Sequence, residues 1–340
     1  MIGVWLVSRL CSLAMSSTSS QVQALEGKKR DELLYLEADT HPRLIAIMLG
    51  RLKMSVEDCI DAYTTLMQEV FAKKENISPF GFAGAVKSRF SSDVLKRAIE
   101  RVLTDNGTPL DEKFEETTQP ACRVYVCRFI SEPIPIVSFT DPSRRFVCAT
   151  FQKMGEVTRL RSYDVHGGND FQPTIVEAAL ATSAAPTYFS EIKIGGSAFI
   201  DGALGANNPA AELEDEARQI FCRGRNDLTE QVACFLSLGT GHMDPASVSD
   251  RGVKHLVKAL KAQTTETNET HKRMSSRWND VSGQCRYYRF NVEHGLAKVT
   301  LAEYKERDTI QSGTFAYLST SDIRNKLQQC VTQLRQRQCT

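Results

Sequence analysis

The chain has 340 residues, of which 41% are hydrophobic and 24% are charged, and this composition is typical of a globular protein with a sizeable core. It excludes collagen-like, intrinsically disordered and small disulfide-stabilised proteins. The 42 basic residues nearly balance the 41 acidic residues, so the chain carries no overall field that would attract nucleic acid.

The first 30 residues differ from the rest of the chain. An apolar stretch at 2–7 precedes a serine-rich stretch that reaches Ser20, and no acidic residue occurs before Glu26. Six apolar residues are too few to span a membrane, and no basic residue precedes them as in a secretory signal. We interpret residues 1–30 as a leader without regular structure, with a mitochondrial presequence as the alternative.

The next segments predict a strand, a turn and three helices. Residues 33–36 have the pattern of a short buried strand, 38–43 of a turn and 44–52 of an apolar helix. A capping box formed by Ser55 and Asp58 opens a second helix that extends to about residue 73. A third, amphipathic helix ends near residue 103, and its apolar side consists of Val94, Leu95, Ile99 and Val102.

Two segments in the middle of the chain, 123–127 and 146–150, both have the composition of buried strands. They resemble one strand written twice around a proline-containing stretch at 131–142.

The remainder of the chain alternates predicted helices and strands. The helices are predicted at 173–184, 208–221 and 301–338, and the strands at 198–200, 232–238 and 287–292. The continuous apolar run at 232–238 is expected for a parallel strand covered on both faces. We place Arg286 and Arg289 near the polar side of the last strand. This alternation predicts an α/β fold with a mainly parallel sheet.

Cysteine and histidine patterns do not indicate a metal site or a disulfide framework. The ten cysteines include no C-x-x-C pair and lie within apolar runs, which favours buried, reduced thiols of an intracellular protein. The six histidines form no H-x-x-x-H pair and no cluster with cysteine. No segment beyond the leader reaches the 18 apolar residues of a membrane-spanning helix.

Candidate chemistry follows the predicted strands, because ligands of α/β sheets bind at the carboxyl ends of the strands. Three positions qualify: Thr40, Asp201 and the turn at 239–242. Taken alone, the Asp201-Gly202 pair and the 239–241 turn are most simply strand-ending turns. The local patterns therefore do not select a function.

Five segments, in their order along the chain, are similar to the patatin-like phospholipases, particularly the type common in fungi. They are Leu44–Met54 (LIAIMLGRLKM), Ala181–Phe189 (ATSAAPTYF), Phe199–Pro209 (FIDGALGANNP), Leu236–Gly241 (LSLGTG) and Arg286–Val292 (RYYRFNV). The resemblance covers most of the chain from about residue 44 to 335.

This resemblance implies a three-layer α/β/α lipid acyl hydrolase with a Ser-Asp dyad, which acts on glycerolipid or phospholipid esters without a metal or other cofactor. The D-G-A motif of the family matches Asp201, Gly202 and Ala203. Asp201 is thus the residue expected to accept the proton of the nucleophile.

Two other parts of the family's machinery are missing from this sequence. No two glycines stand four positions apart, so no G-x-S-x-G exists, and the usual glycine-rich oxyanion loop is absent as well. With Leu44 in register, Thr40 occupies the nucleophile position, but Pro42 disfavours the strained elbow that a nucleophile requires. The alternative is that Thr40 or His41 caps the following helix. The oxyanion donors stay unassigned.

We therefore expect a patatin-like domain at 31–335 that is N-terminally incomplete, with 127–147 as an insertion. Our hypothesis is that both irregularities are faults of the gene model, and transcripts that encode these stretches as written would refute it. The expected function is lipid acyl hydrolysis, with the dyad aspartate retained and activity lost for want of G-x-S-x-G. The alternative is a non-catalytic lipid-binding or interaction protein.

The expected partners are a glycerolipid or phospholipid and, transiently, a lipid surface, with no nucleic acid and no metal. We expect a cytoplasmic protein that is peripheral to membranes. The sequence does not determine the oligomeric state.

Overall fold

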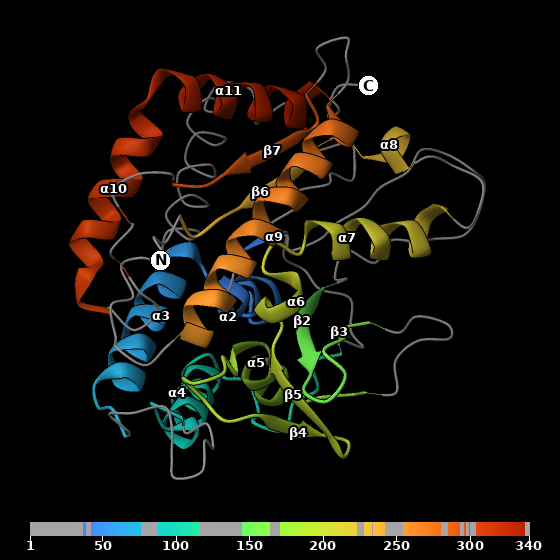
Figure 1. Cartoon of the computed structure of the whole chain (residues 1–340). Helices are drawn as coiled ribbons and strands as arrows, with labels where there is room; N and C mark the ends of the chain where they lie inside the picture. Colours follow the sequence, from blue (N-terminus) through green and yellow to red (C-terminus); the bar gives the residue numbers. More distant parts are fainter. Residues whose placement is uncertain are drawn as a thin grey trace.

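The computed structural model describes residues 37–38, 42–75, 88–115, 145–163, 171–222, 228–232, 234–241, 254–279, 285–292, 296, 299 and 304–336. Within this part of the chain, the strands form two sheets that helices surround (Figure 1). The predicted leader, the strands predicted at 33–36 and 123–127, and most of the predicted insertion lie outside the described residues.

The first helical segment begins earlier than the sequence predicts. Helix α2 spans Pro42–Ala46 and continues into one π-helical turn, η2, at Ile47–Arg51. The predicted helix at 44–52 is thus confirmed, whereas the predicted turn at 38–43 is wrong at Ala38, which ends a short strand, and at its last two residues, which are helical. A proline fits the first position of a helix because that position needs no backbone N–H donor.

The next two helices are present as predicted, with Ser55 as the predicted cap of the first. Helix α3 spans Val56–Phe71, and the Ser55 side chain accepts a hydrogen bond of 3.0 Å from the Asp58 N–H. Helix α4 spans Ser92–Asp105, and Ser91 caps it in the same way. The two helices pack against each other through buried side chains, among them Tyr63, Leu66, Val70, Leu95, Ile99 and Val102.

One sheet is antiparallel, with the strand order β3-β2-β5-β4. Its strands are β2 at Phe146–Phe151, β3 at Val157–Arg161, β4 at Ile192–Ile194 and β5 at Ser197–Asp201. Gly195 and Gly196, with φ of 55° and 84°, connect β4 to β5. Two central residues with positive φ are typical of a tight hairpin turn, which joins neighbouring antiparallel strands.

The other sheet is parallel, with the order β1-β6-β7. Its strands are β1 at Glu37–Ala38, β6 at Phe235–Leu238 and β7 at Tyr287–Phe290, and every residue of β6 and β7 is buried. The α/β class is confirmed, but the prediction of a mainly parallel sheet holds for only one of the two described sheets. The short β2–β3 and β4–β5 connections cannot make the crossover that parallel strands require.

The helices predicted in the second half of the chain are present, together with α9. The bounds are Ile175–Ser183 for α5, Ala203–Ala206 for α6, Ala210–Ala217 for α7 with a π-turn η4 at Arg218–Cys222, Leu228–Gln231 for α8, Lys254–Trp278 for α9, Tyr304–Glu306 for the 3₁₀ turn η6, Arg307–Ser319 for α10 and Ser321–Gln336 for α11. Thr174 and Glu177 form a capping box on α5.

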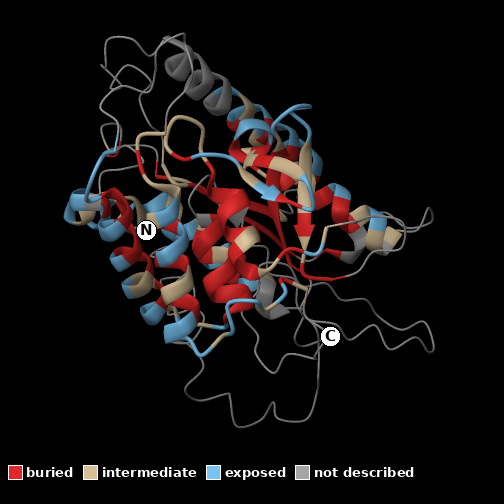
Figure 2. Ribbon diagram, turned by 90° about the horizontal axis from the view of Figure 1, so that it is seen from below, coloured by how far each residue is buried: buried red, intermediate tan, exposed pale blue. Residues whose placement is uncertain are grey.

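Aromatic side chains join α9 to the parallel sheet. The Phe235 ring lies 5.4 Å from that of Trp278 and 5.5 Å from that of Tyr287, measured between centroids. All three side chains are buried, and Figure 2 shows how the buried residues concentrate on the strands and on the helix faces toward them. Aromatic pairs at these separations add to the stabilisation that burial already provides.

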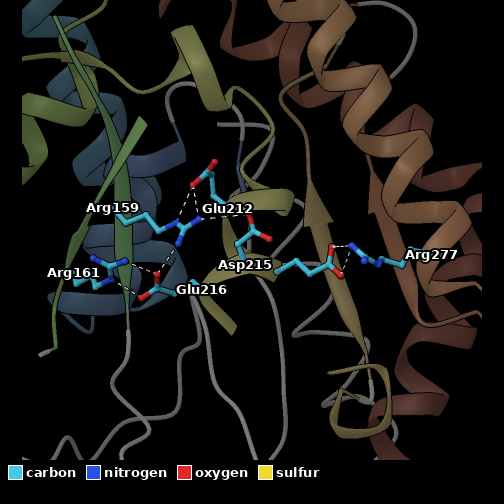
Figure 3. A network of polar contacts seen from close by, with 7 residues as sticks. Arg159, Arg161, Glu212, Asp215, Glu216 and Arg277 are labelled. Atoms are coloured by element: carbon cyan, nitrogen blue, oxygen red, sulfur yellow. Dashed lines mark hydrogen bonds and ion pairs between the residues drawn. The ribbon is translucent and has the colours of Figure 1, made fainter. Parts of the chain in front are cut away.

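Helix α7 is tied to the antiparallel sheet by a network of ion pairs (Figure 3). The buried Glu216 accepts hydrogen bonds from Arg161 Nε at 2.5 Å, from Arg159 Nη1 at 3.0 Å and from the Tyr163 hydroxyl at 2.7 Å. Arg159 also donates to Glu212, one turn before Glu216 on α7. Both arginines lie on β3, so this edge strand is held by charge-assisted bonds.

The same helix is tied to α9 on its other side. The buried Glu214 accepts from Arg218, at 2.9 Å, and from Arg277 of α9, at 3.1 Å. Glutamates two positions apart on a helix point in different directions. Helix α7 can therefore bridge β3 and α9.

We expect Glu216→Gln to destabilise the protein by roughly 3 kcal/mol, because removing one partner of a buried ion pair leaves the arginines uncompensated. That loss corresponds to a melting temperature lower by about 5 °C or more. The matched control is Asp215→Asn, since the Asp215 side chain is 62% exposed and its carboxylate lies 3.9 Å from Arg159. Equal melting temperatures of the two variants would show that the network contributes little.

The stabilisation by Glu216 should depend on pH. Burial acts to raise the pKa of Glu216, but the hydrogen bonds from Arg161 and Tyr163 and the charges of both arginines outweigh it and lower the pKa below its ordinary value. A lowered folded-state pKa gives stability above the ordinary pKa of a glutamate, about 4.3, which is lost as the pH falls through the folded-state value. Thermal melts between pH 7 and pH 3 should show the gap between wild type and Glu216→Gln closing at the acidic end.

Candidate functional site

The structure places Asp201 as the last residue of β5, where it pairs with Ala149 of β2. Its backbone N–H donates to the Ala184 carbonyl at 3.0 Å, and the residue is only 2% exposed. Two strands and the loop after α5 thereby fix the position of the carboxylate. The predicted strand ending at this aspartate is confirmed.

The carboxylate of Asp201 is part of a buried ion pair with Arg43. Arg43 Nη1 donates to Asp201 Oδ1 at 2.8 Å, and Nη2 donates to the Ala206 carbonyl at 2.5 Å. The Ala203 N–H donates to the same Oδ1 at 2.9 Å. Burial raises the pKa of Asp201, while the Arg43 charge and the Ala203 hydrogen bond act against that rise.

Arg43 reaches Asp201 from α2, the helix that follows the first strand of the parallel sheet. Strand β1 ends at Ala38 and α2 begins at Pro42, so Arg43 lies in the first turn of that helix. Thr40 and His41, the residues of the predicted nucleophile position and its neighbour, lie outside the described residues. The described contact of the predicted proton acceptor in this region is therefore the one with Arg43.

Sequence reasoning missed Arg43. The signal available was a basic residue directly before the apolar segment at 44–52, in a protein that buries an aspartate. A buried carboxylate requires a counterion or hydrogen-bond donors. Nothing in the local pattern, however, indicates which of the 42 basic residues meets that need.

Gly202 is required by close packing beside this ion pair. A Cβ at this position would lie 2.4 Å from the Cys148 carbonyl oxygen and 2.7 Å from Arg43 Nη1. Ala203 then begins α6, and its N–H serves Asp201. All three residues of the D-G-A motif therefore have a defined structural role.

A second polar group lies at the carboxyl ends of β6 and β7. Asn291, which follows β7, accepts through Oδ1 from the Gly241 N–H at 2.7 Å. Gly241 has φ of 93°, and a Cβ at Gly239 would lie 2.1 Å from Asn291 Oδ1. The predicted turn at 239–241 is confirmed as a strand-ending turn fastened to the next strand, and His242 lies outside the described residues.

The prediction for Arg289 is wrong. Arg289 is buried, and its Nη1 donates to Ser237 Oγ of the neighbouring strand β6 at 2.6 Å. In a parallel strand covered on both faces, either side of the strand is interior. An arginine there has no polar side to occupy and pairs with a hydroxyl instead.

Within the described part of the chain, no group of three or more histidine, cysteine or acidic residues could hold a metal ion. The six cysteines of that part are free thiols, and Cys234 Sγ lies 3.6 Å from Cys330 Sγ. Among these same residues, no helix has both the length and the apolar character needed to cross a membrane.

Comparisons with known proteins agree with the resemblance noted from the sequence. A family profile described as patatin-like phospholipase matches residues 44–214. The calcium-independent phospholipase A2-gamma of Mus musculus is 26% identical over 290 residues, which cover 83% of this chain and 34% of that protein. Those of Rattus norvegicus and Homo sapiens are each 27% identical over 233 residues, 67% of this chain and 27% of each relative. The chain spans about a third of these relatives or less.

We expect Gly202→Ala to destabilise the protein by roughly 1–3 kcal/mol, because the added methyl group meets fixed backbone atoms in a packed interior. The matched control is Gly205→Ala in the same segment, where the Cβ would meet Val157 Cγ2 at 2.5 Å. That contact is the end of a side chain that can shift, so we expect a smaller loss. Urea unfolding of both variants measures the difference, and a larger loss for Gly205→Ala would contradict the packing argument.

Proposed function

Because the chain belongs to the patatin-like phospholipase family, we propose that it holds a lipid acyl-ester site around Asp201. The observation that supports this site is the placement of Asp201 at the end of β5, beside the segment that follows β1. The substrate class is a glycerolipid or phospholipid ester, as the family name and the phospholipase relatives suggest. The reaction of that class is hydrolysis of a carboxylic ester.

We propose further that Asp201 is the proton acceptor of this site. In the reaction, the carboxylate would take the proton of the attacking hydroxyl while that oxygen bonds to the ester carbonyl carbon and the carbonyl π electrons move onto the carbonyl oxygen. When this oxyanion collapses, the bond to the alcohol breaks and the alcohol leaves with the proton that Asp201 returns. A buried carboxyl with a raised pKa is suited to accept a proton. Ala203, through its N–H, and Gly202, through its close packing, would hold Asp201 in position.

We expect this chain to bind lipid and to hydrolyse it at a negligible rate. The sequence has no G-x-S-x-G, Thr40 at the nucleophile position is flanked by Pro42, and Asp201 is committed to Arg43. Without a serine nucleophile the covalent route is lost, and each missing oxyanion donor costs about 100- to 1,000-fold in rate. Active hydrolysis is the second candidate, and the raised pKa of Asp201 is the observation that favours it.

Membership of the family also supports a proposal for the domain bounds, the layers of the fold and the cellular setting. We assign the chain a single domain at 31–335 with the three-layer α/β/α fold of the family, and α9 packed on β7 supports one of the outer layers. We assign residues 1–30 to a leader and 127–147 to an insertion. The expected setting is the cytoplasm, with transient contact with a lipid surface and no metal or other cofactor.

The test measures ester hydrolysis and lipid binding on the same preparations. We expect wild type and Asp201→Asn to hydrolyse p-nitrophenyl butyrate at the same background rate, while wild type still floats with phosphatidylcholine vesicles. The control variant is Asp215→Asn, which removes an exposed carboxylate on α7.

Hydrolysis by wild type and by Asp215→Asn that is at least tenfold above that of Asp201→Asn would establish the active hydrolase instead. Absence of both hydrolysis and vesicle binding would reject the lipid site altogether.

A further inference from the structure

Arg43 has a hydrogen-bond donor that meets no acceptor in the described part of the chain. Its two terminal nitrogens are bonded to Asp201 and Ala206, whereas its Nε is buried and has no hydrogen-bond partner. The residue as a whole is only 4% exposed. A buried donor without an acceptor is costly, so such an atom in a folded protein calls for an explanation.

A second buried arginine on the same helical segment shows what a purely structural guanidinium looks like. Arg51 donates from Nε to the Phe114 carbonyl at 3.2 Å, and from Nη2 to Glu112 at 2.7 Å and the Lys113 carbonyl at 2.9 Å. Its Nε is therefore satisfied by the protein. Its open Nε distinguishes Arg43 from Arg51, and the guanidinium that carries it is bonded to the proposed proton acceptor, Asp201.

Among the described residues, buried polar side-chain atoms without a hydrogen-bond partner occur in several parts of the core, and two further ones lie next to α6, the short helix that Arg43 contacts through Ala206. They are Thr150 Oγ1 on β2, 4.0 Å from where a Cβ of Gly205 would lie, and Asn207 Oδ1 directly after the helix. Buried polar atoms are usually paired, so the open donor of Arg43, on the side chain that also contacts Asp201, is a candidate for bonding to a ligand.

We propose that Arg43 Nε donates to the carboxylate of a fatty acid, and that this group fixes the polar end of a bound acyl chain. The inference rests on the proposed function, since it names the ligand and the anchoring residue of the same site. Arginine suits a carboxylate because its planar donors match the two oxygens.

A monoanionic ligand fits this site better than a phosphate. Arg43 is already balanced by Asp201, so each further negative charge brought into this buried site has no described counterion. Buried apolar residues adjoin this ion pair along the chain, namely Leu44 after Arg43, and Ala203 and Ala206 after Asp201. A fatty acid brings a single charge and a hydrocarbon tail.

The experiment measures the affinity of the full chain for oleate and for methyl oleate by titration calorimetry below micelle formation. We expect wild type to bind oleate more tightly than its uncharged ester, since a hydrogen bond to a charged group is worth about tenfold or more in affinity. Arg43→Lys should lose that preference and keep its affinity for methyl oleate. The matched control Arg51→Lys should keep both.

A second variant gains preference for oleate, so misfolding cannot imitate its effect. Asp201→Asn keeps an oxygen acceptor for Arg43 but removes the negative charge that competes with the ligand. We expect the ratio of its affinity for oleate to its affinity for methyl oleate to be several-fold higher than that of wild type. This result supports the proposal even if Arg43→Lys does not fold.

The outcomes distinguish the role of Arg43 from the existence of the lipid site. Equal binding of oleate and methyl oleate by wild type, or an unchanged ratio in Asp201→Asn, overturns the role of Arg43 and leaves the lipid site standing. Binding of neither ligand rejects the proposed function itself. Displacement of oleate by inorganic phosphate but not by acetate overturns the fatty acid in favour of a phosphate group.

Discussion

A buried carboxylate requires a positive charge or hydrogen-bond donors from within the protein, and the arrangement around Asp201 follows from this requirement. Asp201 ends a strand of the antiparallel sheet, and Arg43 opens the helix that follows the parallel sheet. Their ion pair of 2.8 Å therefore joins β5 of the antiparallel sheet to α2. Next to this pair, Gly202 has no room for a side chain, because a Cβ there would lie 2.4 Å from the Cys148 carbonyl oxygen and 2.7 Å from Arg43 Nη1.

At the edge of the antiparallel sheet, the charge network on α7 also supplies counterions to a buried carboxylate, that of Glu216. Strand β3 is an outer strand, and Arg159 and Arg161 bind it to Glu216, while Glu214 reaches Arg277 on α9. Because α7 comes shortly after the D-G-A turn, it carries this support close to the candidate site. Both places pair an arginine with a buried carboxylate. At β3 the pairs hold the strand against α7, whereas at the candidate site Arg43 also carries an Nε without a hydrogen-bond partner among the described residues.

The sequence predicts what is local and leaves open what depends on distant partners. Helix starts at Ser55 and Thr174 are predictable because a capping side chain lies within three residues of its acceptor or donor. Asp201 is found through its motif. Parallel or antiparallel pairing is not predictable in this way, since it depends on which strands meet, and the buried state of Arg289 depends on a neighbouring strand. Arg43 and Asp201 are 158 positions apart, and no local pattern connects them.

The partner of Asp201 determines what this carboxylate can do. A proton acceptor has to exchange between an ionised and a protonated form, and burial favours the protonated form, whereas an arginine, which keeps its charge at every accessible pH, favours the ionised one. The positive charge of Arg43 opposes the effect of burial on the pKa, so Asp201 is a weaker base than burial alone would make it. An anion bonded to Arg43 would partly offset the arginine's charge and so raise the pKa of Asp201 further. If the proposed acyl carboxylate binds to Arg43, its binding and the basicity of Asp201 are therefore coupled through one guanidinium, so that each would strengthen the other.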